Sequence, residues 1–262
     1  MYNMSRTPFH LVEYSPWPIL MSFSSLSLPV SVIYMVRTNE ISYLIFNMAC
    51  ATFIITLWLR DVVRESTFQG YHTSYVVKGL KLGFMMFILS EIMFFVGFFW
   101  AYFHSSVSPD VALGGVWPAT GIIPVSPFSI PLINTVCLLS SGVSLTWSHH
   151  AIIESKKGEA LWGLLATLLL GLFFIFCQIM EYSEATFTIS DSVFGSVFYL
   201  ATGFHGFHVS MGLIMLLVCL IRLSSYHFST NHHVGFLVSA WYWHFVDVVW
   251  LFLFVSMYWW PS

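Results

Sequence analysis

A single carboxylate interrupts the apolar stretch LGFMMFILSEIMFFVGFFWAYFH, which covers residues 82–104. This acid is Glu91, and the stretch is long enough to cross a bilayer, which takes about 20 apolar residues. An ionised carboxylate at the bilayer centre costs from about 3 to more than about 10 kcal/mol, so Glu91 must be neutral, paired, or facing protein or water. Two interpretations stay open: a proton-linked or packing-critical acid facing the interior of a helix bundle, or a protonated acid hydrogen-bonded to a neighbouring helix.

Histidines accompany acidic or small residues in two other apolar stretches. In AWYWHFVDVVWLF, His244 and Asp247 are three residues apart and share a helix face. They form either a carboxylate-oriented metal ligand or, as we favour, a polar pair that satisfies itself. In TGFHGFH, His205 and His208 have the spacing of bundle ligands, but the glycines beside them are equally typical of close helix packing. We therefore expect buried polar pairs and no metal site in this chain.

The composition indicates an integral membrane protein. Hydrophobic residues make up 58% of the 262 residues and charged residues 8%, with a mean hydropathy of +0.80, whereas soluble domains are roughly a quarter charged. The nine Lys and Arg residues form no dense cluster, which argues against nucleic-acid binding. The four cysteines stand singly in apolar stretches and resemble small core residues rather than disulfide or metal pairs.

Hydropathy predicts seven membrane-spanning helices. The expected spans are residues 17–36, 41–59, 82–104, 129–152, 160–180, 192–221 and 234–258. Helices are expected rather than a barrel, because these stretches are long and continuously apolar instead of short and alternating.

The basic residues divide unequally between the two ends of the spans. One side of a seven-span chain collects Arg6, Arg60, Arg64, Lys78, Lys81, Lys156, Lys157 and Arg222. The other side receives only Arg37. Because Lys and Arg accumulate on the inner side of membrane proteins, we expect the N-terminus inside and the C-terminus outside.

Several longer motifs occur in a fixed order along the chain. They are PFHLVEYSPWP, LRDVVRESTFQGYHT, FILSEIMFFVGFFWAYFHSS, GVWPATGI, PLINTVCLLSSGVSLTWSHH, FTISDSVFGSVFYLATGFHGFHV and AWYWHFVDVVWLFLFVSMYWW. Together they extend from Pro8 to Trp260, and the sequence closely resembles subunit III of mitochondrial-type cytochrome c oxidase.

This resemblance implies an all-α membrane protein with seven helices in a V-shaped arrangement. Residues 1–81 would form a two-helix segment with an inner-surface connector, residues 82–262 a five-helix bundle, and phospholipids would fill the cleft between them. The chain would be a non-redox core subunit that stabilises the catalytic subunit, supports proton uptake and aids oxygen access. It would hold no cofactor except structural phospholipids, with haem and copper bound in partner subunits.

The resemblance also implies roles for particular residues. Glu91 matches a buried glutamate that faces the protein interior near the lipid cleft and the catalytic subunit. The positions expected near lipid headgroups and the inner surface are Arg60, Arg64, Glu65, His72 and Arg222. The expected partners are oxidase subunits I and II, small accessory subunits and membrane phospholipids, with the N-terminus in the matrix and the C-terminus in the intermembrane space of mitochondria.

Two alternatives are weighed against this interpretation. A quinol oxidase subunit III typically lacks the first two spans, and this chain has both. An independent proton-coupled transporter using Glu91 would be expected to show broken helices or paired repeats around a midplane site, and the sequence contains neither.

Overall fold

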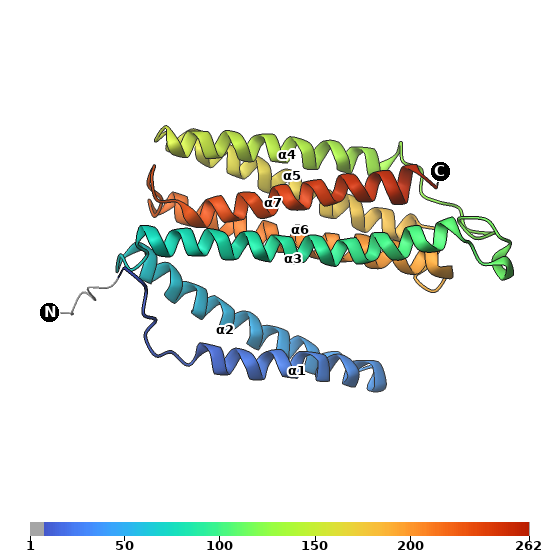
Figure 1. Ribbon diagram of the computed structural model, residues 1–262, viewed down its shortest axis with the longest axis horizontal. Coiled ribbons are helices and arrows are strands. Elements are labelled where there is room, and N and C mark those ends of the chain that lie inside the picture. Colours follow the sequence, from blue (N-terminus) through green and yellow to red (C-terminus); the bar gives the residue numbers. More distant parts are fainter. Residues whose placement is uncertain (1–7, 262) are drawn as a thin grey trace. The chain divides into compact units, whose positions relative to one another are not determined.

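The computed structural model describes residues 8–261, so Arg6 of the charge count lies outside the described residues. Within this range the chain is all-helical, and seven helices are long and apolar enough to cross a membrane. The long helices are α1 (Trp17–Thr38), α2 (Ser42–Thr67), α3 (Ser74–Val107), α4 (Ile130–Ile153), α5 (Lys157–Glu184), α6 (Ser192–Ser224) and α7 (Val234–Leu253) (Figure 1). A short 3₁₀ turn, η1 (Val111–Leu113), follows α3, and a π-helical turn, η2 (Phe254–Trp259), prolongs α7. The predicted all-α, seven-span fold class is confirmed.

Two of the helices extend well beyond their predicted spans. Helix α2 continues to Thr67 instead of ending near residue 59, and α3 begins at Ser74 instead of residue 82. Hydropathy detects only the apolar part of a helix, whereas backbone hydrogen bonds continue wherever the chain lacks a breaker. The basic residues that were expected in a surface connector, such as Arg64 and Lys78, therefore lie on helices.

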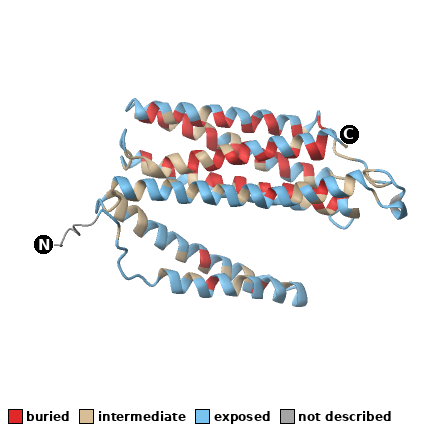
Figure 2. Cartoon of the chain, in the orientation of Figure 1, coloured by how far each residue is buried: buried red, intermediate tan, exposed pale blue. Residues whose placement is uncertain are grey.

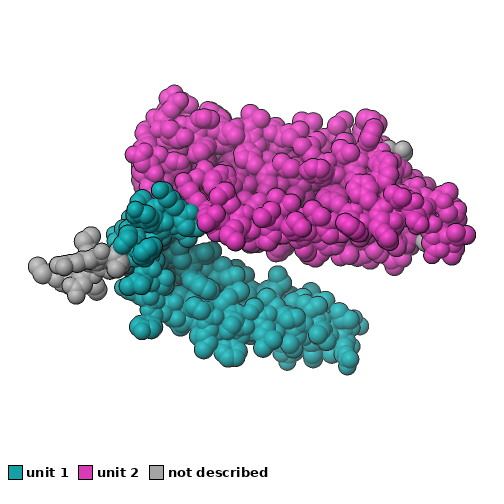
Figure 3. Space-filling model, in the orientation of Figure 1, with its two compact units in different colours: residues 1–80 teal, residues 81–262 magenta. Residues whose placement is uncertain are grey.

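The chain divides into two compact units, residues 1–80 and residues 81–262, with the boundary inside α3 (Figure 3). In the first unit, α1 packs against α2. The buried residues of these two helices are small: Ser24, Ser31 and Ala51. Small side chains let two helix backbones approach closely, which is how helices associate in lipid. The indole Nε1 of Trp17 donates to Asp61 Oδ2 at 2.7 Å and joins the start of α1 to the polar end of α2.

In the second unit, α4, α5, α6 and α7 form a closed ring in which each helix packs against the next and α7 returns to α4. Most of the buried residues of this unit lie on these four helices (Figure 2). Helix α3 joins the ring through large side chains: Phe95 and Tyr102 are buried, and the Phe95 ring lies 6.2 Å from that of Phe245.

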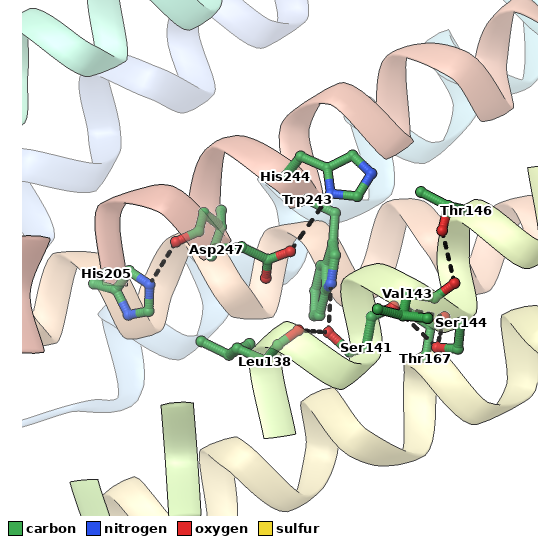
Figure 4. A network of polar contacts seen from close by, with 11 residues as sticks. Leu138, Ser141, Val143, Ser144, Thr146, Thr167, His205, Trp243, His244 and Asp247 are labelled. Carbon is green, nitrogen blue, oxygen red and sulfur yellow. Dashed lines mark hydrogen bonds and ion pairs between the residues drawn. The ribbon is translucent and has the colours of Figure 1, made fainter. Parts of the chain in front are cut away.

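The contact between α4 and α5 depends on small and hydroxyl residues. A Cβ atom on Gly163 would lie 2.9 Å from the Ser144 carbonyl oxygen, so only glycine permits this approach. Ser148 Oγ donates to the Ala160 carbonyl oxygen at 2.8 Å. The hydroxyls of Ser144 and Thr167 are also 2.8 Å apart (Figure 4). The serines of the span 129–152 therefore serve helix packing.

Trp243 occupies a tight slot at the centre of the ring. Its side chain is fully buried, and its Nε1 donates to Ser141 Oγ on α4 at 2.8 Å (Figure 4). Gly171 of α5 and Gly212 of α6 lie against its ring. An added Cβ atom would be 2.7 Å from an indole carbon at Gly171 and 2.8 Å from one at Gly212. Because the indole is held on several sides, it cannot move to accept a larger neighbour.

Gly212→Ala should destabilise the chain by about 1–3 kcal/mol, because the added methyl group overpacks the immobile Trp243 ring. Gly206→Ala on the same helix is the matched control, since a Cβ atom there meets no described atom within 4 Å. The control should be neutral or slightly stabilising, because alanine favours a helix over glycine by up to about 1 kcal/mol. The measurement is the midpoint of thermal loss of helical circular dichroism in detergent, and equal midpoints for the two variants would contradict the packing argument.

Candidate functional site in the membrane-spanning helices

Glu91 on α3 and His208 on α6 are brought together by the packing of these two helices. Glu91 Oε2 and His208 Nε2 are 2.8 Å apart, and the two residues are 117 positions apart in sequence. The side chain of His208 is 7% exposed and that of Glu91 is 23% exposed. The ring of Phe95, one turn after Glu91, lies edge-on to the imidazole with centroids 5.1 Å apart. The acid in the middle of the apolar stretch 82–104 therefore has a basic partner on another helix.

The second nitrogen of His208 decides how many protons the pair holds. His208 Nδ1 lies 2.6 Å from the carbonyl oxygen of Phe204, which can only accept, so Nδ1 carries a hydrogen. One further proton must then lie between Nε2 and Glu91 Oε2, because two acceptors cannot form a hydrogen bond. The pair is either a carboxylic acid with a neutral imidazole or a carboxylate with an imidazolium. In both states its net charge is zero, which is how the hydrocarbon region tolerates the acid.

His205 is separated from this pair although it lies on the same helix. Its side chain is buried, and its Nε2 donates to the Val246 carbonyl oxygen on α7 at 3.1 Å (Figure 4). The rings of Phe174 and Trp250 lie on it, with centroids 5.6 and 5.3 Å away. The Nε2 atom of His205 therefore bonds to α7 and that of His208 to α3, so the two imidazoles do not converge on a common point.

His244 and Asp247 on α7 lie close together but are not hydrogen-bonded. His244 Nδ1 is 3.6 Å from Asp247 Oδ2, which is within ion-pair range (Figure 4). The Asp247 side chain is 8% exposed, whereas the His244 side chain is 41% exposed. Within the described part of the chain, Asp247 Oδ1 has no hydrogen-bond partner. The imidazole thus lies between the buried acid and the surface of the bundle.

The residues matched to lipid-headgroup positions fall into separate groups. Arg60 and Arg64 are exposed. Arg60 Nη2 lies 3.1 Å from Asp61 Oδ1, and Arg64 Nη1 lies 3.9 Å from the same oxygen. Glu65 Oε2 lies 3.2 Å from His10 Nε2, and the His72 ring is 5.9 Å from the His10 ring. These residues belong to the first unit.

Arg222 belongs to the second unit, at the end of α6. Its guanidinium carbon lies 4.6 Å from the centre of the Phe228 ring, within the range of a cation–π contact. The other four headgroup positions lie in the first unit.

Two polar clusters were not anticipated from the sequence. Glu181 is buried on α5 and accepts from Tyr258 at 2.6 Å and from Gln178 at 3.1 Å. The i, i+3 spacing of Gln178 and Glu181 was a visible signal, but the predicted span ended at residue 180. His149 and His233 each come from a histidine doublet and approach to 3.2 Å between their Nε2 atoms. These two residues are 84 positions apart, so no local spacing predicts this pairing between α4 and the residue directly before α7.

Glu91→Ala should lower the free energy of unfolding by about 1–3 kcal/mol, because it leaves His208 Nε2 buried without a partner. Glu91→Gln should stay close to the unsubstituted protein, since its amide can donate to the neutral imidazole. His208→Ala tests the same contact from α6, and the double variant with Glu91→Ala should cost less than the sum of the two. Unfolding by a denaturing detergent, followed by tryptophan fluorescence, provides the comparison; additive losses would mean that the contact contributes nothing.

Comparison with known proteins identifies the family. A family model described as cytochrome c oxidase subunit III matches residues 7–262. The proteins named cytochrome c oxidase subunit 3 from Branchiostoma lanceolatum and Coturnix japonica are each 52% identical to this chain, over 255 and 254 residues, with 97% of both chains covered. The protein of the same name from Paracentrotus lividus is 52% identical over 255 residues, which are 97% of this chain and 98% of its own. The chain belongs to the cytochrome c oxidase subunit III family.

Proposed function

We propose that this chain is a non-redox core subunit of the mitochondrial respiratory oxidase, supporting the reduction of oxygen to water coupled to proton pumping. The match of the family model over residues 7–262 carries this proposal. The relatives reported above are named as cytochrome c oxidase subunits. This disfavours the alternatives of a quinol oxidase subunit and an independent proton-coupled transporter.

Haem and copper would be held by partner subunits, with no redox cofactor in this chain. In support, His208 uses both ring nitrogens on protein atoms, and His205 uses Nε2 on the Val246 carbonyl oxygen. The i, i+3 histidine pair of α6 therefore does not offer two free nitrogens to one ion.

The proposed partners are oxidase subunits I and II and small accessory subunits. Helix α3 supports this: only 6% of its most apolar 18-residue window is buried, compared with 56% for the last span. A membrane subunit presents such an apolar face to neighbouring chains or to lipid. Glu91 and His208 lie where α3 meets α6, so a neighbour against α3 would lie close to a pair that shares a proton.

Glu91 is proposed to support proton uptake and the durability of the catalytic subunit. The pair has one mobile proton between Nε2 and Oε2 and stays neutral whichever atom carries it. The proton can move between these two atoms without changing the net charge, and passing it to a neighbour keeps the pair neutral only when another donor replaces it. The same contact fixes α3 against α6.

Phospholipid binding is proposed at Arg60, Arg64, Glu65, His72 and Arg222. The exposed guanidinium groups at the polar end of α2 are suited to headgroup phosphates, because each cation near an anionic membrane surface contributes about 1 kcal/mol. Glu65 and His72 would lie beside them at the same end of the helix. The first two helices, in residues 1–81, would lean away from the five-helix bundle of residues 82–262, leaving a lipid-filled cleft that aids oxygen access.

The N-terminus is proposed to lie in the matrix and the C-terminus in the intermembrane space. Eight basic residues on one side against Arg37 on the other support this orientation. An odd number of crossings places the two ends on opposite faces, in agreement with the seven apolar helices of the described residues.

Glu91→Gln in the assembled oxidase should leave the haem content unchanged while lowering turnover or shortening its active lifetime. The amide keeps the hydrogen bond to His208 but cannot exchange a proton. Haem absorbance and co-purification of the catalytic subunit measure assembly, and oxygen consumption over time measures activity. Loss of haem and partners would show that the acid is purely structural, and a colourless, solitary unsubstituted chain would argue for the transporter.

Arg60→Ala combined with Arg64→Ala should reduce the anionic phospholipid that remains with the purified protein, because two phosphate-binding cations are removed. Arg37→Ala is the control, since this residue lies at the end of α1 away from the other basic residues. Mass spectrometry of the retained lipid provides the comparison. Unchanged lipid content in the double variant would argue against headgroup binding at the end of α2.

A further inference from the structure

Three side chains of the first unit direct metal-ligand atoms toward one another. They are His10 before α1, Glu65 near the end of α2, and His72 between α2 and α3. One ligand atom from each lies within 4.8 Å of those of the other two, and among the described residues this is the one group of three or more His, Cys, Asp or Glu residues that meets this distance. All three residues are partly buried, so their side chains are restrained without being closed off from solvent.

The distances agree with coordination by one ion. Nitrogen and oxygen ligands lie about 2.0–2.2 Å from Zn²⁺, which places two ligands of a tetrahedral site about 3.4 Å apart. His10 Nε2 and Glu65 Oε2 are already 3.2 Å apart. The ligand atom of His72 lies within 4.8 Å of the other two, so a side-chain movement of at most about 1.5 Å brings it to the same separation, and the partly exposed position of its ring allows that movement.

The backbone around the three ligands is tied together independently of them. Thr73 Oγ1 donates to the Pro8 carbonyl oxygen at 2.5 Å, which joins the segment before α1 to the segment before α3. The Tyr71 amide donates to the Glu65 carbonyl oxygen at 3.1 Å, and the Tyr71 ring stacks on His10 with centroids 5.3 Å apart. These contacts hold the three segments in place before any ion arrives, which lowers the cost of binding.

The chemistry of the group favours a cation over a bare phosphate. Two imidazoles and one carboxylate form a donor set that proteins use for Zn²⁺, with a fourth position left open. The carboxylate of Glu65 would repel a phosphate, and the nearby guanidinium groups of Arg60 and Arg64 lie beside Asp61 instead. A bound divalent ion would change the net charge of the three side chains from negative to positive. Its fourth coordination position would stay open for water or for a phosphate oxygen.

We propose that His10, Glu65 and His72 form a binding site for a divalent transition-metal ion of the Zn²⁺ type at the polar end of α2. The site joins the segment before α1, the end of α2 and the segment before α3 through one ion. The site shares Glu65 and His72 with the proposed headgroup positions but does not use Arg60 or Arg64, so loss of lipid in the Arg60 and Arg64 double variant would leave the zinc proposal standing.

Zinc titration of the full-length chain in detergent, against a competing chromophoric chelator, tests the site. His10→Asn, Glu65→Gln and His72→Asn should each weaken the binding of one zinc ion at least about 100-fold. Loss of a residue that only hydrogen-bonds to a metal ligand already lowers metal affinity about 10–100-fold, and these variants remove a ligand itself. His104→Asn and Glu13→Gln are the matched controls: both residues are exposed and lie outside the cluster, and both variants should bind as the unsubstituted chain does.

X-ray absorption of the zinc-loaded, unsubstituted chain gives a second measurement that needs no variant to fold. It should show only nitrogen and oxygen ligands, with scattering from two imidazoles. Equal zinc affinity in the three cluster variants and the unsubstituted chain would overturn the proposal, as would a zinc ion without imidazole ligands. Loss of that ion in His149→Asn, with retention in the cluster variants, would place it on the His149–His233 pair and would equally overturn it.

Discussion

The hydrocarbon region offers no water, so each polar group inside it must find its partner within protein. Helices meet this demand for the backbone, and side chains meet it in pairs across helices. Glu91 with His208, Trp243 with Ser141 and His205 with the Val246 carbonyl oxygen each join two different helices. The polar residues that look misplaced in apolar stretches therefore determine which helices lie together. Asp247 and Asn134 are exceptions: Asp247 Oδ1 and both polar side-chain atoms of Asn134 have no hydrogen-bond partner among the described residues.

Apolar burial alone cannot choose these neighbours, because lipid is as apolar as the side chains that it surrounds. Close packing therefore acts together with the polar pairs to select which helices lie side by side. At the contact of α4 with α5, Gly163 approaches the Ser144 carbonyl oxygen, and around Trp243 two glycines line the indole. The ring of α4 to α7 is tightly packed for this reason. Helix α3 joins it through long aromatic side chains, which leave more of its apolar surface for a neighbour.

The sequence predicted the number, type and order of the helices, because each span is a local property of about 20 residues. It did not predict that α2 continues through Arg60 and Arg64 to Thr67, since hydropathy does not follow a helix into the polar surface. The partner of Glu91 could not be predicted either: His208 is 117 residues away, and no local pattern relates the two. The grouping of His10 with Glu65 and His72 depends equally on how distant segments meet. Local periodicity therefore predicts the elements, whereas their pairing comes from tertiary packing.

The hydrogen on His208 Nδ1 determines the net charge of the pair that joins α3 to α6. Because the Phe204 carbonyl oxygen fixes that hydrogen, the pair holds one proton between Nε2 and Oε2 and has no net charge. Adding a proton would create a buried cation, and removing one would create a buried anion; both are costly in a low-dielectric surrounding. The pair therefore joins α3 to α6 without adding net charge to the interior of the second unit.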